Sequence, residues 1–356
     1  MKENEKKLFW ELCKFKSSDL DEPLLAYATP AVLGQLFFNR MQGVAYDTLR
    51  MGGMLGKVNR EFRNSLGSAY EQNIFRNQSF FEGVSMLSDI LSACDCKVAM
   101  LKGAFLCAHY PQGCRTSNDI DLLVLPEDVT TVGDLLSFAG FGQGYIREGK
   151  FTPASRKEIV QSKMMRGETV PYVKEVDLPF MKYLEVDINF SLDYKNGNKD
   201  VLKAMLDRRT VRREKNLKIP TLEMPDFFLH LCAHLYKEAT TLPWIEMHRD
   251  MALYKYGDIY LLISEMSATD ITGIFHRAEE LGLEKVCAYA VLETMELFDM
   301  SHDDTWARAS EILAQTPAFR LEVVAPEGKK KFVYQTVDVT ERFFMEDRAR
   351  DLVENP

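Results

Sequence analysis

Residues 117–124 read Ser-Asn-Asp-Ile-Asp-Leu-Leu-Val, and this stretch decides the predicted fold. Two carboxylates, separated by one apolar residue, lead into an apolar run, a pattern that predicts a buried β-strand. Side chains two residues apart share one face of a strand, so Asp119 and Asp121 are expected to project the same way. Like charges held this close repel, and a divalent cation between them is the usual remedy. The stretch therefore indicates a metal site.

A glycine turn precedes this acidic strand. Leu101-Lys102-Gly103-Ala104 stands at the end of an apolar run that begins at Val98. Glycine allows the backbone to approach a phosphate group closely. The turn and the acidic strand together predict metal-assisted phosphoryl chemistry, which neither feature indicates strongly by itself.

A third acidic segment follows at residues 183–190, Tyr-Leu-Glu-Val-Asp-Ile-Asn-Phe. Polar and apolar residues alternate, which predicts a strand with Glu185 and Asp187 on one face. Carboxylates on a strand face usually mark a face open to solvent. Because an earlier strand already carries a carboxylate pair, a metal site shared by the two strands is the alternative interpretation.

Composition limits the possible functions. The chain has 356 residues, and its formal net charge of -9 argues against general nucleic-acid binding, which needs clustered cations. The seven cysteines form no framework of pairs, so free thiols in a reducing compartment are expected. The charged start lacks the apolar core of a signal peptide, and no 18-residue apolar span follows. We therefore expect a cytoplasmic protein without a membrane partner.

The pattern of the chain predicts three parts. Residues 1–95 show helical periodicity, residues 96–215 alternate strands with short helices, and residues 216–356 return to helical periodicity. The predicted fold class is α+β, with a core formed by a small mixed β-sheet that carries the carboxylates, between N-terminal helices and a C-terminal helical domain. Within the last part, one helix is predicted over residues 243–256, and the tail beyond about residue 320 has no predicted structure.

The order of glycine turn, acidic strand and later acidic strand resembles the polymerase-beta-like nucleotidyltransferases. More narrowly, the chain is similar to uncharacterised bacterial nucleotidyltransferase family proteins. This resemblance is carried by Leu101-Lys102-Gly103, Tyr110-Pro111, Arg115, residues 119–124 and the helical run at 228–237. It covers about residues 97–190, with weaker support to about residue 260.

The resemblance implies a set of metal ligands. Asp119 and Asp121 would bind two Mg²⁺ ions, and Glu185 or Asp187 would supply a third carboxylate. Two such ions can stabilise both the attacking and the leaving oxygen of an in-line displacement. Glu185 is the better match to the family pattern.

The resemblance also implies a phosphate-binding turn shaped by Gly103. Lys102 or Ala104 would stand near the place of the serine of the wider superfamily, where Lys-Gly-Ala replaces Gly-Ser in this chain. The lost hydroxyl contact to phosphate can be replaced by the charge of the Lys102 ammonium. Arg115 is predicted to bind phosphate, with a loop arginine paired to a surface acid as the alternative.

The implied activity is Mg²⁺-dependent transfer of a nucleoside monophosphate from a nucleoside triphosphate to a hydroxyl group of a small molecule or protein, with release of pyrophosphate. A catalytically lapsed nucleotide-binding or partner-binding module is the second hypothesis, because the turn departs from the superfamily pattern. A metal-dependent phosphohydrolase is disfavoured, because histidine ligands are lacking near the two aspartates.

Two further motifs invite a functional interpretation. His230 and His234 have the i, i+4 spacing of a metal-binding helix, but Leu231 stands where H-E-x-x-H has glutamate, which favours packed or hydrogen-bonded histidines. His248-Arg249-Asp250 matches a kinase triplet, yet residue 255 is lysine where a kinase has asparagine. We interpret this triplet as a coincidence.

Overall fold

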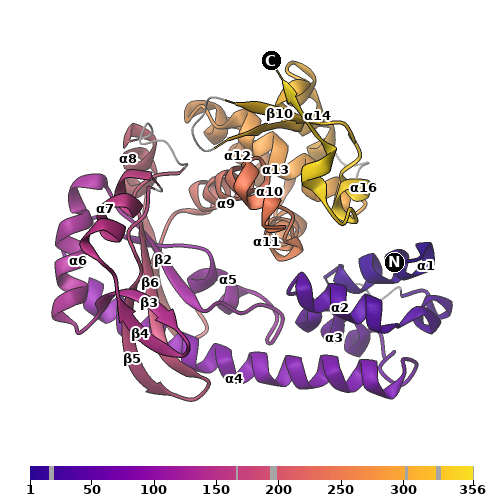
Figure 1. The fold of residues 1–356 in the computed structure, drawn as a ribbon, viewed down its shortest axis with the longest axis horizontal. Coiled ribbons are helices and arrows are strands. Elements are labelled where there is room, and N and C mark those ends of the chain that lie inside the picture. Colours follow the sequence, from indigo (N-terminus) through magenta and orange to yellow (C-terminus); the bar gives the residue numbers. More distant parts are fainter. Residues whose placement is uncertain (16–19, 166, 193–198, 301–303, 326–329, 356) are drawn as a thin grey trace. The chain divides into compact units, whose positions relative to one another are not determined.

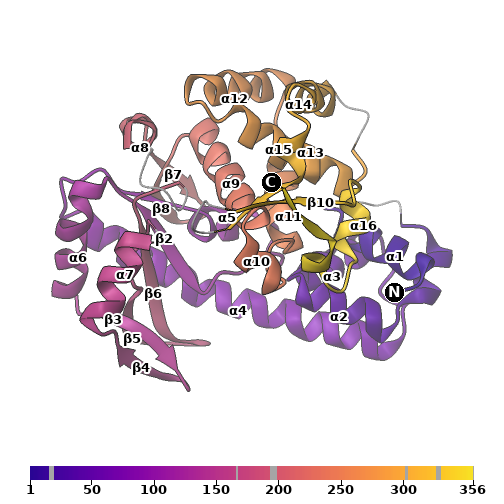
Figure 2. The same ribbon diagram turned by 45° about the horizontal axis from the view of Figure 1, so that its top comes forward.

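The computed structural model describes residues 1–15, 20–165, 167–192, 199–300, 304–325 and 330–355. The chain forms two compact units, Met1–Glu223 and Met224–Pro356 (Figures 1 and 2). Helices account for 57% of the residues and strands for 17%. This content, together with a mixed sheet and a helical C-terminal region, confirms the predicted α+β class. The first unit contains both the N-terminal helices and the sheet, and the finer boundaries near residues 95 and 215 stay predictions.

The first unit begins with helices. They are α1 (Glu3–Cys13), the 3₁₀-helix η1 (Glu22–Tyr27), α2 (Pro30–Phe38), α3 (Gln42–Met51) and α4 (Arg60–Leu91). Proline occupies the first position of α2, where its missing N–H costs nothing, and α3 ends at Gly52-Gly53, where Gly53 has φ 67°. Asn59 caps α4 by accepting a hydrogen bond from the Phe62 N–H at 2.9 Å. Helix α4 extends from these helices to the sheet (Figures 1 and 2).

The sheet of the first unit has six strands in the order β1-β2-β6-β5-β3-β4. The strands are β1 (Ala99–Met100), β2 (Asp119–Leu123), β3 (Gly142–Arg147), β4 (Lys150–Pro153), β5 (Tyr172–Leu178) and β6 (Met181–Asn189). Strands β2 and β6 are parallel, whereas the other pairs are antiparallel. The sheet is therefore mixed, and the single parallel pair joins the two acidic segments. The remaining elements of this unit are α5 (Gly103–His109), η2 (Pro126–Asp128), α6 (Val129–Phe138), α7 (Arg156–Met165), α8 (Lys199–Asp207), β7 (Thr210–Glu214) and β8 (Leu217–Thr221).

One face of the sheet is the core of this unit. Its apolar side chains from β2 and β6 are completely buried and pack with residues of α4 and α6; they are Ile120, Leu122, Leu184, Val186 and Ile188. Because side chains alternate along a strand, burying this set turns the intervening acidic residues to the opposite face. The hydrophobic core thus orients the candidate site.

The second unit is mostly helical and includes one small sheet. Its helices are α9 (Met224–Ala239), α10 (Leu242–Glu246), α11 (Leu253–Glu265), α12 (Ala268–Glu280), α13 (Glu284–Leu297), α14 (Asp304–Ala314), α15 (Ala318–Leu321), α16 (Val339–Phe343) and η3 (Arg348–Asp351). Strands β9 (Glu322–Val324), β10 (Lys331–Tyr334) and β11 (Leu352–Asn355) pair in the order β11-β10-β9. This sheet lies in the tail for which the sequence predicted no structure.

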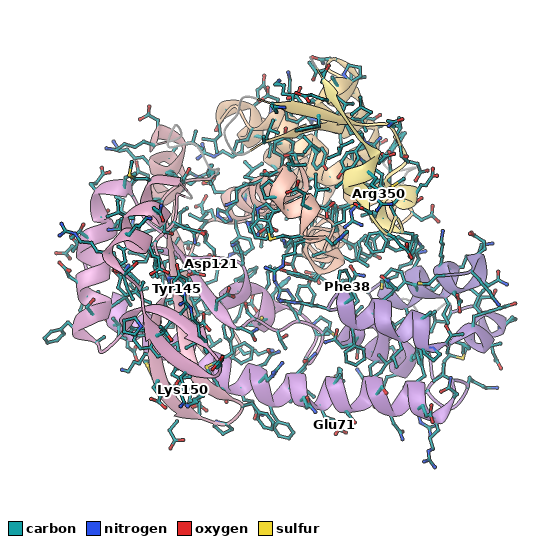
Figure 3. All side chains as sticks on the ribbon, in the orientation of Figure 1. Phe38, Glu71, Asp121, Tyr145, Lys150 and Arg350 are labelled. Atoms are coloured by element: carbon teal, nitrogen blue, oxygen red, sulfur yellow. The ribbon has the colours of Figure 1, made fainter. Side chains whose placement is uncertain are left out.

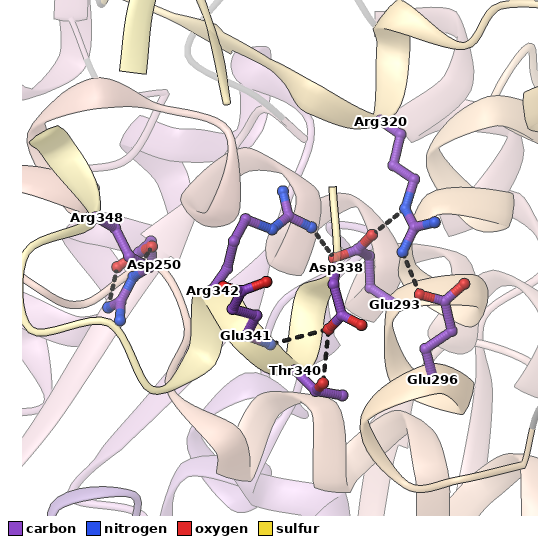
Figure 4. A network of polar contacts seen from close by, with 9 residues as sticks. All are labelled: Asp250, Glu293, Glu296, Arg320, Asp338, Thr340, Glu341, Arg342 and Arg348. Atoms are coloured by element: carbon purple, nitrogen blue, oxygen red, sulfur yellow. Dashed lines mark hydrogen bonds and ion pairs between the residues drawn. The ribbon is translucent and has the colours of Figure 1, made fainter. Parts of the chain in front are cut away.

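The prediction of a single helix over residues 243–256 is wrong, because the structure has two helices there, α10 and α11. Helix α10 ends at Glu246, the Arg249 N–H donates to the Trp244 carbonyl at 2.8 Å, and His248 has φ 56°. A residue in the left-handed region is a common helix terminator. Asp250, just after this residue, is buried and forms a bidentate ion pair with Arg348 (Figure 4). A residue far along the chain therefore stabilises the interruption between α10 and α11.

A buried charge network stabilises the second unit (Figure 4). Glu293 on α13 accepts a hydrogen bond from Arg342 Nη2 at 2.7 Å and also pairs with Arg320, which reaches Glu296 as well. Glu293 is 1% exposed, so its charge is balanced by these two arginines and not by water.

Across the described residues of both units, no helix is both long enough and apolar enough to cross a membrane.

Candidate functional site

The parallel pairing of β2 and β6 brings the predicted acidic residues together. In the register of the two strands, Asp119 lies beside Glu185 and Asp121 lies beside Asp187. Neighbouring strands are about 4.8 Å apart, and paired residues of parallel strands project to the same face. All four carboxylates therefore share the face opposite the core, and Figure 3 shows Asp121 on this sheet.

The carboxylates on this face repel one another. Burial, followed by the charges of Asp121 and Asp119, raises the pKa of Asp187 well above its ordinary value. Burial and the charge of Asp119 also raise the pKa of Glu185. Such elevations mean that the face would be stabilised by a cation, because a cation lowers the cost of ionising the carboxyl groups.

Lys102 supplies one cation to this face. Its Nζ lies 2.9 Å from Oδ1 of Asp121, and Asn189 Nδ2 donates to the same oxygen at 3.2 Å. Burial opposes the charge on Lys102, yet the carboxylates of Asp121, Asp119 and Asp187 hold its pKa above the ordinary lysine value. The charged form of Lys102 is therefore favoured at this face.

The glycine turn positions Lys102. The Leu101 N–H donates to the Asp121 carbonyl at 2.9 Å, which ties the turn to β2. Helix α5 begins at Gly103, which packs against Ser117, and the Ser117 hydroxyl donates to Asp119 Oδ1 at 2.9 Å. The turn and the acidic strand thus form one structural element, although they are separate in the sequence.

Ala104 and Arg115 occupy different surroundings. Ala104 is completely buried in the hydrophobic core, and its N–H donates to the Leu101 carbonyl at 3.2 Å. Arg115 is 8% exposed, and its guanidinium donates to the Thr116 carbonyl. The structure thus places the Ala104 side chain in the core, whereas the role of Arg115 in phosphate binding remains a prediction.

Two asparagines on α4, which the sequence analysis did not identify, hold the loop before β2. Asn73 Nδ2 donates to the Gly113 carbonyl at 2.9 Å, and Asn77 Nδ2 donates to the Arg115 carbonyl at 2.8 Å. Both side chains are buried. The signal in the sequence is their i, i+4 spacing in line with the apolar stripe that continues at Phe80, which marks polar residues on the buried face of a helix.

The donor chemistry of the acidic face fits Mg²⁺. Carboxylate oxygens and the amide oxygen of Asn189 are hard ligands, and Mg²⁺ usually takes one or two carboxylates while phosphate and water complete its shell. Within the described ranges, no group of three or more His, Cys, Asp and Glu side chains is already arranged to hold a metal ion.

The histidines of α9 have other partners. His230 is buried, and His234 Nε2 lies 3.5 Å from Oε1 of Glu238, which also pairs with Lys255. His230 is thus packed inside the unit, and His234 lies beside a carboxylate. The third residue of the kinase-like triplet, Asp250, forms the ion pair with Arg348 described above.

Comparison with known proteins defines the class. The chain belongs to a family of nucleotidyltransferases, since the family described as Uncharacterised nucleotidyltransferase matches residues 29–299. The broad resemblance seen in the sequence is thereby confirmed, whereas the narrower polymerase-beta-like and bacterial assignments stay predictions.

A separate comparison with curated proteins found no match. Among solved structures, the chain is similar to an antigenic nucleotidyltransferase-like protein from Paracoccidioides brasiliensis. The identity is 14%, the TM-score is 0.33, and the match covers 58% of this chain and 91% of that chain. A likeness at this level supports no conclusion about the present protein.

Proposed function

We propose that this protein transfers a nucleoside monophosphate from a nucleoside triphosphate to a hydroxyl group of a small molecule or protein and releases pyrophosphate, with Mg²⁺ as cofactor. The observation that carries the proposal is the in-register pairing of Asp119 with Glu185 and of Asp121 with Asp187. Membership of a nucleotidyltransferase family supports the same reaction class.

Asp119 and Asp187 are the favoured metal ligands in this proposal, and Asp121 holds the Lys102 ammonium beside them. Asp187 experiences the charges of both Asp121 and Asp119, whereas the charge that acts on Glu185 is that of Asp119. Mg²⁺ bound here would neutralise charge on the phosphates and on the acceptor oxygen. We thus favour Asp187 over Glu185 as the third ligand, although the family resemblance prefers Glu185.

Glu185 is then available as a general base. Its half-buried carboxyl has a raised pKa, and a raised pKa makes a carboxylate a better proton acceptor near neutral pH. In the proposed step, the acceptor oxygen attacks the α-phosphorus, pyrophosphate leaves, and Glu185 takes the hydroxyl proton. Lys102 and Arg115 bind phosphate oxygens, and the Gly103 turn allows the phosphates to approach the backbone.

A labelling experiment tests this proposal. The protein is incubated with Mg²⁺, cell extract and each α-labelled nucleoside triphosphate in turn, and incorporated label and pyrophosphate are both measured. We expect incorporation that is lost in Asp119→Asn and Asp121→Asn and is retained in Asp177→Asn, which changes an exposed aspartate of β5. Label incorporation that persists in the first two variants would refute the proposed site.

The second candidate function is a nucleotide-binding or partner-binding module without catalysis. The ion pair between Lys102 and Asp121 favours it, because a carboxylate engaged by an ammonium is less available to a metal ion. Tight nucleotide binding without pyrophosphate release by the wild-type protein would support this module and contradict the enzyme.

A further inference from the structure

We infer that the Lys102 ammonium takes the place of one of two cations in the acidic site, so that the protein binds a single divalent ion. This inference rests on the proposed function and specifies its cofactor. The resemblance to nucleotidyltransferases implies two ions, but the contacts of Lys102 support a mixed pair that consists of one ammonium and one metal ion.

The first argument is the position of the ammonium. Nζ of Lys102 lies 2.9 Å from Oδ1 of Asp121 and donates a hydrogen bond to it. A divalent ion held by Asp121 would compete for the same oxygen, which already accepts a second hydrogen bond from Asn189. In this inference the Asp121 carboxylate binds the Lys102 ammonium, and the carboxylates of Asp119 and Asp187 bind the divalent ion.

The second argument is the backbone that presents Lys102. This residue has φ 40° and ψ -111°, which lies in a region that residues with a Cβ atom rarely adopt. Both neighbours are constrained, because Leu101 is bonded to β2 and Gly103 packs against Ser117. A strained residue that carries a charged side chain into a candidate site is typical of a functional position.

The third argument is charge repulsion. Four carboxylates share this face, and the Lys102 ammonium already pairs with one of them, Asp121. A second divalent ion beside Asp121 would repel this ammonium. Lys102 can bind a phosphate oxygen and Asp121 together, which is the bridging role of a metal ion.

Mn²⁺ binding tests the inference directly. Mn²⁺ is titrated into the full chain in the presence of a non-hydrolysable nucleoside triphosphate analogue, and free Mn²⁺ is measured by its electron paramagnetic resonance signal. A parallel titration without protein gives the ions held by the analogue alone. Beyond the ions held by the analogue alone, we expect one Mn²⁺ per wild-type chain and two per Lys102→Gly chain. Glycine is chosen because it accepts the positive φ and removes the ammonium. Lys102→Arg keeps a positive charge and should still bind one.

Two aspartate variants make the test independent of Lys102 substitutions. Asp121→Asn should still bind one Mn²⁺, because the carboxylate that it removes binds the Lys102 ammonium and not the metal ion. Asp119→Asn should bind Mn²⁺ at least tenfold more weakly, because it removes a metal ligand. Two Mn²⁺ ions per wild-type chain, no Mn²⁺ at all, or equal weakening in both aspartate variants would overturn the inference. Turnover with two bound ions would overturn the single-ion inference and leave the proposed function intact. One bound ion without turnover would support the single-ion inference and contradict the proposed enzyme.

Discussion

Gly103 and Ser117 pack so closely that a Cβ atom on the glycine would lie 2.5 Å from both Cβ and Oγ of Ser117. The hydroxyl of Ser117 bonds Asp119, so this close approach joins the turn to the first acidic residue. Any side chain at residue 103 would have to move the start of β2. The glycine is thus required by packing against β2, in addition to its proposed role beside phosphate.

Gly103→Ala should therefore lower the free energy of unfolding by about 1–3 kcal/mol, as expected for an overpacked interior. It should also reduce turnover, because Asp119 is displaced with Ser117. Gly34→Ala is the matched control, since a Cβ there meets nothing within 4 Å in the exposed middle of α2. The control should gain roughly 0.5–1 kcal/mol through helix propensity. Urea denaturation measures both changes, and equal effects would contradict the packing argument.

Asp187→Asn should alter the pH dependence of stability in metal-free buffer. The folded protein holds the Asp187 proton more tightly than the unfolded chain does, because burial and Asp121 raise its pKa. Its contribution to stability is fully present below the unfolded pKa of about 3.9 and is lost as the pH rises through the raised folded pKa. Asparagine cannot ionise, so the variant should become more stable relative to wild type by about 1 kcal/mol or more between pH 4 and 7. Asp177→Asn should show no such trend in urea denaturation.

Mg²⁺ with a bound nucleoside triphosphate should stabilise the protein. At a hundredfold excess over its Kd, a ligand that binds the folded state alone adds about 2.7 kcal/mol. Thermal denaturation should therefore show a higher Tm, which EDTA largely reverses. Asp119→Asn should remove most of the Mg²⁺-dependent gain, whereas Asp177→Asn should retain it. A gain that is unchanged in Asp119→Asn would place the metal elsewhere.

Glu293→Gln should strongly destabilise the second unit. The change leaves the buried Arg342 without its charged partner and weakens the hold on Arg320, and breaking a buried ion pair in this way costs about 3–5 kcal/mol. Glu280→Gln removes a carboxylate that pairs with Arg277 but is 65% exposed, and it should cost at most about 1 kcal/mol. Denaturation followed by circular dichroism compares the two, and similar losses would contradict the assigned role of the network.

The sequence predicts well those features that depend on local periodicity. Alternation along residues 183–190 places Glu185 and Asp187 opposite Val186 and Ile188, and the structure buries these two apolar residues completely. The proline at the start of α2 and the glycine pair at the end of α3 are local signals of the same kind. Such features can be read from the sequence because backbone geometry and local solvent preference determine them.

Other features depend on partners far away in the chain. The break between α10 and α11 accompanies the pairing of Asp250 with Arg348, which stands 98 residues further on. Asn73 and Asn77 lie in line with the apolar stripe of α4, but the loop carbonyls that they bind stand 40 and 38 residues further along the chain. Periodicity along α4 contains no information about which distant backbone groups will need a donor.

The candidate site shows both kinds of feature. The sequence by itself determined that Asp119 and Asp121 lie on the same face of their strand, because side-chain direction alternates along any strand. It determined the same for Glu185 and Asp187 on theirs. Only the tertiary structure decided that β2 and β6 pair in parallel with these residues side by side, and that Lys102 reaches Asp121. Strand register and charge pairing are set by packing of the whole core, which joins segments that have no local influence on one another.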